Sequence, residues 1–231
     1  MTLAIMQPYF LPYIGYWQLL ASADRFVVYD NIKYTKQSWI NRNRFLRDGE
    51  AVFFTLPLKH GSDALDIADR WLADDFDPAA LLNPLTSTYR RAPFFAAVLP
   101  LLETILAAAP RNLFEFLLRS LRATAAFLDI RTPLIRSSEV AIDHGLKAQE
   151  KVLAICRTLG ATRYVNAIGG QELYSAAAFA AHGVDLRFVQ SHPIIYSQYD
   201  RPFVPSLSIV DVMMFNSRDR VRTMLGACDL V

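Results

Sequence analysis

The stretch between residues 3 and 30 constrains the fold more than any other part of this chain. It reads LAIMQPYFLPYIGYWQLLASADRFVVYD. Residues 3–6 and 26–29 are short apolar runs, typical of parallel strands covered on both faces. Residues 14–21 are long enough for two helical turns between them. A strand, a turn, a helix and a second strand indicate a βαβ unit, whose first turn lies at the carboxyl edge of a sheet, where open α/β sheets bind ligands.

The turn after the first strand carries more polar and aromatic side chains than a plain connection requires. Gln7, Tyr9, Tyr13 and Tyr16 lie in it or directly after it. Hydroxyl and amide groups donate and accept hydrogen bonds, and the aromatic rings add contact area. We therefore predict that these four residues form the floor of a binding site.

The second half of the chain repeats the alternation of strands and helices. The expected elements are strands at residues 132–136, 162–167 and 186–189 and helices at residues 147–158 and 172–182. Gly160 and Gly183 follow the two helices, where glycine is common. Such alternation predicts an α/β fold with a parallel, Rossmann-like sheet flanked by helices.

Two further features interrupt the α/β rhythm. Residues 38–46 and 51–58 read as strands with Asp48-Gly49 between them, which indicates a β-hairpin, and residues 66–72 suggest another short strand. Apolar residues at helical spacing predict a helical insert over about residues 78–130, with one helix starting at Asn112. We expect residues 1–231 to form one domain that contains this insert.

Composition narrows the functional classes. The net charge is +2, from 24 basic and 22 acidic residues, which gives no broad electrostatic reason to bind duplex nucleic acid. Cys156 and Cys228 lie in unrelated contexts, and no metal-type spacing of ligands is found. No apolar run is long enough for a membrane span, and no signal peptide is recognisable. We expect a cytoplasmic protein with no metal and no cofactor; the oligomeric state stays open.

The segment SWINRNR, at residues 38–44, is the second candidate binding motif. On a strand, Asn41 and Asn43 would share one face, and Arg42 and Arg44 the other. Two guanidinium groups about 7 Å apart along a strand can bind a diphosphate or a carboxylate. The alternative is a solvated edge strand whose charges deter aggregation.

The segment YVNAIGGQELY, at residues 164–174, is the third motif and reads as a strand, a glycine turn and a helix start. Asn166 would anchor a ligand by hydrogen bonds, Gly169 and Gly170 would allow its close approach, and Gln171 would add a polar contact. An ordinary turn is the competing explanation, since turns use Gly-Gly widely.

Two residues are candidates for a catalytic base. Asp30 ends the second strand, although an aspartate before Asn31 can also cap a turn. His60 follows a strand and is the best placed of the 4 histidines, although solvation explains it as well. Tyr34 lies in a loop that could close over a ligand. The sequence has no G-x-S-x-G elbow, Walker A sequence or G-x-G-x-x-G, which disfavours hydrolase, nucleoside-triphosphatase and nicotinamide chemistry.

Five motifs in order, MQPYFLPYIGYWQL, DNIKY, SWINRNR, YVNAIGGQELY and LSIVDVM, resemble the WbqC-like protein family. This bacterial family is associated with surface-polysaccharide genes. The resemblance implies transfer of an aminoacyl group, such as glycyl, to an amino sugar carried on a nucleotide. A phosphorylated small molecule is therefore the expected partner.

A second resemblance covers only the opening turn. Tyr13-Ile14-Gly15-Tyr16 is similar to the P-H-x-G-H turn of nucleotidylyltransferases and pantothenate synthetases, but tyrosine occupies both histidine positions. Tyrosine cannot supply an imidazolium charge at neutral pH. This resemblance implies an alternative function, activation of a carboxylate with ATP. A non-catalytic interaction protein of a biosynthetic assembly is the third possibility.

Overall fold

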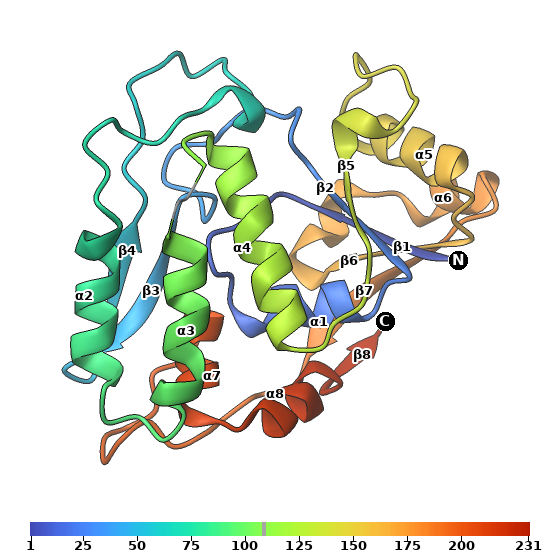
Figure 1. The fold of residues 1–231 in the computed structure, drawn as a ribbon. Helices are drawn as coiled ribbons and strands as arrows, with labels where there is room; N and C mark the ends of the chain where they lie inside the picture. The colour runs from blue at the N-terminus through green and yellow to red at the C-terminus, as the bar shows by residue number, and fades with distance from the viewer. Residues whose placement is uncertain (108–109) are drawn as a thin grey trace.

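A six-stranded sheet organises the computed structural model, which describes residues 1–107 and 110–231 (Figure 1). Its strands are β1 (Thr2–Met6), β2 (Arg25–Val28), β5 (Leu134–Arg136), β6 (Arg163–Ala167), β7 (Asp185–Ser191) and β8 (Cys228–Leu230). Their order across the sheet is β5-β2-β1-β6-β7-β8, and all neighbours are parallel except β7 and β8. This arrangement is the doubly wound order of Rossmann-like folds, so the predicted α/β class is confirmed.

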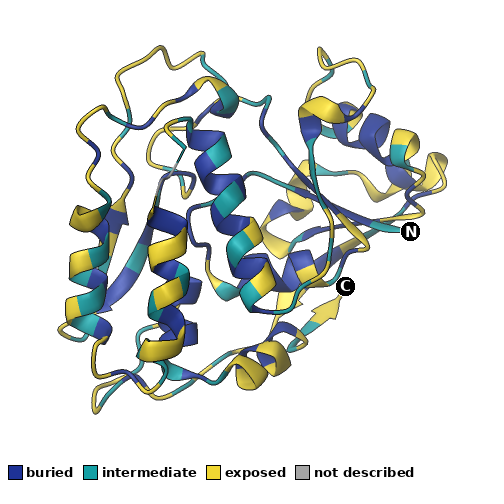
Figure 2. Ribbon diagram, in the orientation of Figure 1, coloured by how far each residue is buried: buried dark blue, intermediate teal, exposed yellow. Residues whose placement is uncertain are grey.

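Alternating residues of β1 face two different layers of helices. Leu3 and Ile5 pack into the cluster of buried residues that includes α5 (Ala148–Leu159) and α6 (Ala176–Ala181). Ala4 packs into the larger cluster, which includes α1 (Ile14–Ala21) and α8 (Arg218–Leu225). Because side chains of a strand alternate between its faces, an apolar run like β1 requires a cover on both sides. Figure 2 shows buried residues, in dark blue, along the strands and helices.

The predicted hairpin forms a separate antiparallel sheet of β3 (Arg42–Arg47) and β4 (Glu50–Thr55). Asp48 and Gly49 connect them with φ values of 56° and 86°, as a tight hairpin turn requires. Both strands differ from the predicted ranges: β3 begins at residue 42, not 38, and β4 spans 50–55, not 51–58. The approach to β3 is bent, because Gln37 adopts a φ of 62° and Ser38 donates its N–H to Thr35 O.

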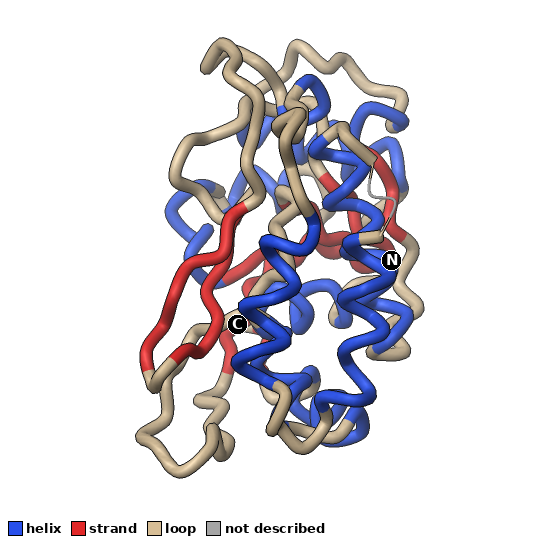
Figure 3. The backbone as a smooth tube through the Cα atoms, turned by 60° about the vertical axis from the view of Figure 1, so that its left-hand side comes forward, coloured by secondary structure: helices blue, strands red, loops and turns tan. Residues whose placement is uncertain are grey.

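Helices fill the predicted insert between the hairpin and β5. They are α2 (Pro78–Tyr89), α3 (Phe95–Leu106) and α4 (Leu113–Phe127). Figure 3 shows the hairpin, in red, beside these helices. Asn112 caps α4 as predicted, because its Oδ1 accepts the N–H of Glu115 at 3.1 Å. One hydrophobic cluster continues from these helices to the hairpin and the main sheet.

Two local predictions need correction. Residues 66–72 form no strand but a 3₁₀ turn, η1 (Ile67–Asp69), flanked by isolated bridges. Residues 172–182 do not form one helix, because η3 (Ile168–Leu173) ends before Ser175, whose side chain caps α6 by accepting the N–H of Ala178. A further 3₁₀ turn, η2 (Ser137–Glu139), follows β5.

The tail forms a helix, α7 (Ile209–Phe215), followed by α8. Ser208 caps α7 by accepting the N–H of Val210 at 3.2 Å. Asp211 does not complete a capping box, because its carboxylate is turned toward Tyr89, Tyr196 and Gln198. Within the described residues, no helix combines the length and apolarity that crossing a membrane demands.

Candidate functional site

The opening turn and the diglycine corner meet at the carboxyl edge of the sheet. β1 and β6 are adjacent and parallel, and the chain leaves them in opposite directions along the sheet, toward β2 and toward β7. Ligands of open α/β sheets bind at such a switch point. A cavity of ≈ 710 Å³ lies here, which we call the switch-point cavity. Its lining includes Gln7, Tyr9, Tyr13, Tyr16, Asn166, Gly169 and Gly170.

Gly15 allows the ring of Tyr13 to lie over the start of α1. A Cβ atom at Gly15 would be 2.5 Å from the Tyr13 Oη, closer than real contacts allow. The Tyr13 side chain is 44% exposed. Burial raises the pKa of Tyr13 above its usual value, so the phenol stays neutral at physiological pH and can donate a hydrogen bond.

Tyr16 supports the turn from inside. Its Oη donates to Gln7 O at 3.1 Å, and its side chain is buried. Burial raises the pKa of Tyr16 well above the usual value, and Tyr9 adds to the effect. The half-buried Tyr9 packs against it with 5.7 Å between ring centroids. Tyr16 therefore positions the turn, whereas Tyr9 and Tyr13 present the larger polar-aromatic surface.

Asn166 and Gly170 fit together on the other wall of this cavity. Asn166 is buried, and its Oδ1 accepts the N–H of Ala167 at 2.8 Å. A Cβ atom at Gly170 would be 2.9 Å from Asn166 Nδ2, whereas one at Gly169 would meet nothing within 4 Å. Gly169 thus leaves open space at the wall. Gln171 is exposed and does not line the switch-point cavity.

A second cavity, of ≈ 360 Å³, lies between the hairpin and the same turn, and we call it the arginine cavity. Its lining is Tyr9, Pro12, Tyr13, Trp39, Asn43, Arg44 and Ser206. Tyr9 and Tyr13 line both cavities. The structure therefore brings the opening turn, residues 39–44 and the diglycine corner to one region.

Arg44 supplies the positive charge of the arginine cavity. Its Nη2 donates to Ser206 O at 3.1 Å, and its Cζ lies 5.4 Å from the Trp39 ring centroid. Its Nε is buried without a hydrogen-bond partner. No carboxylate of the described residues lies within ion-pair distance of this guanidinium. Arg44 is thus a cation that a bound anion could neutralise.

Arg42 lies on the same face of β3 as Arg44 but makes other contacts. One Nη of Arg42 donates to Gln37 O, and its Cζ lies 4.8 Å from the Phe53 ring centroid. Trp39 and Phe53 stack with 6.0 Å between centroids, and these rings lie against the two arginines. Arg42 lines neither cavity, so only Arg44 of the predicted pair reaches the site.

Asn41 and Asn43 hold the backbone that surrounds the site. Asn41 Nδ2 donates to Leu56 O at 2.8 Å, and its Oδ1 accepts from Tyr34 Oη at 2.8 Å. Asn43 Nδ2 donates to the carbonyl oxygens of Phe10 and Leu11, at 3.0 and 2.9 Å. The side-chain NH₂ groups of both asparagines therefore donate to backbone carbonyl oxygens of the protein. Asn43 thereby fixes the hairpin to the opening turn and places Arg44 beside Tyr13.

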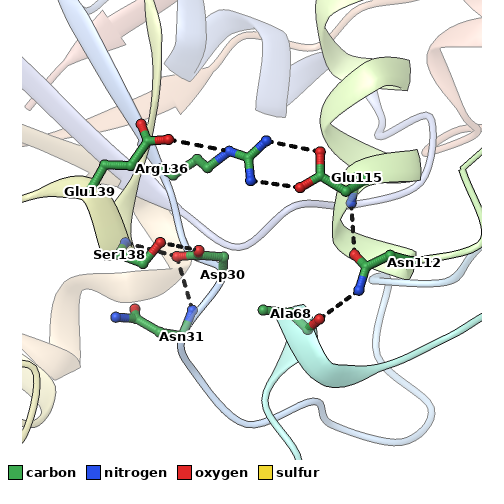
Figure 4. A network of polar contacts seen from close by, with 8 residues as sticks. All are labelled: Asp30, Asn31, Ala68, Asn112, Glu115, Arg136, Ser138 and Glu139. Atoms are coloured by element: carbon green, nitrogen blue, oxygen red, sulfur yellow. Dashed lines mark hydrogen bonds and ion pairs between the residues drawn. The ribbon is translucent and has the colours of Figure 1, made fainter.

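Asp30 belongs to a polar network behind the site (Figure 4). Its carboxylate accepts from Ser137 Oγ at 2.6 Å, Ser138 N at 2.9 Å and the hydroxyl of Ser138. Burial acts to raise the pKa of Asp30, but these hydrogen bonds outweigh it and lower the pKa below the usual value. Asp30 lines neither cavity.

Lys151, in the same network, gave no signal as a site residue in the sequence. Its side chain is buried, and Nζ donates to Asn31 O at 3.1 Å and to Asn31 Oδ1 at 3.0 Å. Burial lowers the pKa of Lys151, while Asp66 and Asp30 act in the opposite direction. Nζ lies 5.5 Å from the centroid of Tyr29, which lines the switch-point cavity.

His60 lies apart from the other predicted residues. It is exposed in the loop after β4 and lines neither cavity. In the described part of the chain, no three His, Cys, Asp or Glu residues are grouped so that they could hold a metal ion.

The chain is similar to known proteins along nearly its whole length. Residues 7–223 match the WbqC-like protein family. An uncharacterized protein of Mycobacterium tuberculosis, Rv1507c, is 29% identical over 216 residues, which cover 92% of this chain and 92% of that protein. No solved structure gives a significant match. The family match includes the opening turn, the hairpin and the diglycine corner, and the chain belongs to the WbqC-like protein family.

Proposed function

We propose that this protein is a transferase that acylates the amine of a nucleotide-linked amino sugar, or of a similar phosphorylated small molecule, in the biosynthesis of surface polysaccharide or a related product. One observation carries the proposal: Tyr9 and Tyr13 line both the cationic arginine cavity and the switch-point cavity, whose largely apolar lining also includes the amide side chains of Gln7 and Asn166. A ligand with an anionic and a polar part can therefore contact both cavities at once.

Arg44 is the proposed phosphate ligand. Its guanidinium lines the arginine cavity and has no carboxylate partner among the described residues. Guanidinium and phosphate form charge-assisted hydrogen bonds that are stronger than neutral ones. Stacking on Trp39 fixes the plane of this side chain, which reduces the entropy lost on binding.

The switch-point cavity is the proposed place of the sugar and of the reacting amine. Tyr13, with its neutral phenol, and Gln7 can hydrogen-bond to sugar hydroxyl groups. Gly169 allows close approach because nothing lies within 4 Å of its Cβ position. Asn166 holds this wall through its bond to Ala167 N.

In the proposed reaction, the uncharged amine of the sugar attacks the carbonyl carbon of an activated acyl donor. A C–N bond forms, the bond from that carbon to the leaving group breaks, and the leaving group departs with the electron pair. The amine loses its proton to water in the open cavity. Asp30 and His60 remain predicted proton acceptors, but they line neither cavity, and the proposal does not depend on them.

The ATP-dependent alternative has less support from the geometry. In that mechanism the second tyrosine of the Tyr13-Ile14-Gly15-Tyr16 turn would contact phosphate. Tyr16 is instead buried and donates to Gln7 O at 3.1 Å. An interaction protein without catalysis would not require an unpaired arginine beside the switch-point cavity.

Calorimetric titration with a UDP-linked amino sugar tests the proposal, followed by mass spectrometry of the sugar after incubation with acyl donors. We expect saturable binding, and a mass increase that corresponds to one acyl group. Binding without acylation by any thioester or acyl-phosphate donor would contradict the transferase assignment. Absence of binding would contradict the ligand class as well.

A further inference from the structure

A third cavity, of ≈ 400 Å³, adjoins the proposed site and differs from it in chemistry. It lies between the start of α1, α7 and residues 191–207, and we call it the apolar cavity. Its lining includes Ile14, Ile194, Ile195, Phe203, Leu207 and Val212. The aliphatic and aromatic side chains come from segments that are far apart in the sequence, so the surface depends on the fold.

Tyr13 is the residue where the three cavities meet. It lines the apolar cavity, the arginine cavity and the switch-point cavity. Ser206 is shared with the arginine cavity and Ser191 with the switch-point cavity. The apolar cavity therefore adjoins the proposed site, and Tyr13 lies on the boundary between them.

Three polar side chains at the apolar cavity, away from its border at Tyr13 and Ser206, are already bonded within the protein. The Ser191 hydroxyl donates to Gln18 Oε1, His192 Nε2 pairs with Asp229 Oδ2 at 2.9 Å, and Tyr196 Oη donates to Asp211 Oδ1 at 2.7 Å. Tyr196 thus contributes its ring and not its hydroxyl. A polar ligand group would find few free partners here and would lose its hydration, which is unfavourable.

The exposure of Ile195 supports the same interpretation. Its side chain is 70% exposed at this cavity. Isolated exposed apolar residues are common, but this one adjoins a continuous apolar surface, and such surfaces mark binding sites. A hydrocarbon group in this cavity would cover Ile195 and remove apolar area from water on both partners.

We propose that the apolar cavity binds a hydrocarbon acyl group carried by the donor, so that its carbonyl lies at Tyr13, beside the amine in the switch-point cavity. This inference rests on the proposed function and deepens it by naming the acyl class. It departs from the small, polar glycyl group that the family resemblance implies. The arginine cavity would then hold the phosphate of the nucleotide-linked sugar, and the apolar cavity would hold the hydrocarbon group of the acyl donor.

Binding of n-alkyl phosphates tests this inference on the purified full-length protein. Methyl, butyl and hexyl phosphate carry the same anion and differ only in the chain. We expect butyl phosphate to bind about tenfold more tightly than methyl phosphate, with a further gain for hexyl phosphate, because each buried CH₂ group adds affinity. Equal affinities for all three would overturn the inference while leaving the phosphate site of the proposed function intact.

Ile195→Asp is the decisive variant, because a largely exposed residue can be changed at little cost to folding. It should reduce the ratio of hexyl to methyl phosphate affinity to about one, because the added carboxylate weakens binding of the shared phosphate group equally across the series and removes only the gain from chain length. Leu230→Asp, at an exposed leucine of β8 that lines none of the three cavities, is the matched control and should keep the gain. Loss of the gain in both variants, or in neither, would overturn the inference.

Uncharged ligands test the apolar cavity independently of the proposed phosphate site. If methyl phosphate does not bind, the proposed phosphate site is wrong, and hexanamide is then compared with acetamide. Tighter binding of hexanamide that Ile195→Asp removes would support the apolar cavity on its own. Equal binding of the two amides, or binding of neither, would overturn the inference.

Discussion

The Tyr89 hydroxyl donates to Asp211 Oδ2 at 2.7 Å, across a sequence separation of 122 residues. The same oxygen of Tyr89 accepts the N–H of Leu46 at 3.0 Å. Both side chains are fully buried. One phenol therefore connects α2, the hairpin and α7, and it fixes the hairpin that carries Arg44 to the body of the protein.

Tyr89→Phe should lower the free energy of unfolding by about 2 kcal/mol, because it leaves a buried N–H and a buried carboxylate oxygen without this partner. Urea denaturation followed by circular dichroism measures the effect. Tyr199→Phe is the control: its Oη donates to Thr88 O at 2.7 Å, but the residue is partly exposed, and we expect less than about 1 kcal/mol. Equal losses in the two variants would contradict the bridging role of Tyr89.

Asp211 should make folding less favourable as the pH rises. Burial raises the pKa of its carboxyl group above the usual value, although hydrogen bonds from Tyr196, Tyr89 and Gln198 oppose this shift. The folded state therefore retains the proton to higher pH than the unfolded state, and the stabilisation is lost as pH rises through the folded pKa. The free energy of unfolding of the wild type, minus that of Asp211→Asn, should decrease as the pH rises above about 4, the ordinary pKa of an aspartate. A constant or increasing difference would contradict this prediction.

The pH dependence of the stabilisation by Asp30 should be opposite to that of Asp211. Although burial opposes it, hydrogen bonding from Ser137 and Ser138 lowers the pKa of Asp30, so its stabilisation is present above the unfolded pKa and is lost as pH falls. The difference in unfolding free energy between the wild type and Asp30→Asn should therefore decrease below about pH 4. Chemical denaturation at a series of pH values measures this difference for the Asp30 and Asp211 variants. If both differences changed with pH in the same direction, the hydrogen-bond networks assigned to the two residues would be contradicted.

Gly170→Ala should disturb the wall of the switch-point cavity. The new Cβ would lie 2.9 Å from Asn166 Nδ2, so Asn166 must turn and weaken its bond to Ala167 N. We expect a loss of about 1 kcal/mol in unfolding free energy. Gly169→Ala, whose Cβ would meet nothing within 4 Å, should change stability by less than about 0.5 kcal/mol. Differential scanning calorimetry distinguishes the two variants, and indistinguishable midpoints would contradict the packing described.

Arg44→Ala should weaken binding of a UDP-linked amino sugar by about tenfold or more, because a charged hydrogen bond to phosphate is lost. Arg42→Ala should change the affinity by less than about threefold, because Arg42 donates to Gln37 O and lines neither cavity. Calorimetric titration of both variants measures the difference. A larger effect at Arg42 would restore the paired clamp that the sequence suggested and contradict the role given to Arg44.

Local patterns in the sequence were sufficient to predict the fold class. The apolar runs at β1 and β2 and the Asp48-Gly49 turn correspond to observed elements, and Gly160 adopts a φ of 70° at the end of α5. Such features depend on neighbouring residues. The helix predicted at 172–182 was wrong because its apolar periodicity does not reveal that Ser175 starts a new cap.

Long-range contacts explain what the sequence did not predict. Asn43 was expected to contact a ligand; it lines the arginine cavity, and its Nδ2 also donates to the carbonyl oxygens of Phe10 and Leu11, which are 33 and 32 residues away. Asp211 reads as a helix-start residue until its bonds to Tyr89 and Tyr196 are known. A local bend has a similar effect before β3: alternation predicts that Arg42 and Arg44 share a face, but not that Gln37 adopts a φ of 62° and accepts a hydrogen bond from Arg42 at its carbonyl oxygen.

Hydrogen–deuterium exchange with and without a saturating UDP-linked amino sugar tests whether the three segments form one binding site. We expect residues 7–16, 39–44 and 166–170 to become protected together, because one ligand contacts all three segments around Tyr9 and Tyr13. Protection confined to one of these segments, or to other parts of the protein, would contradict a shared site.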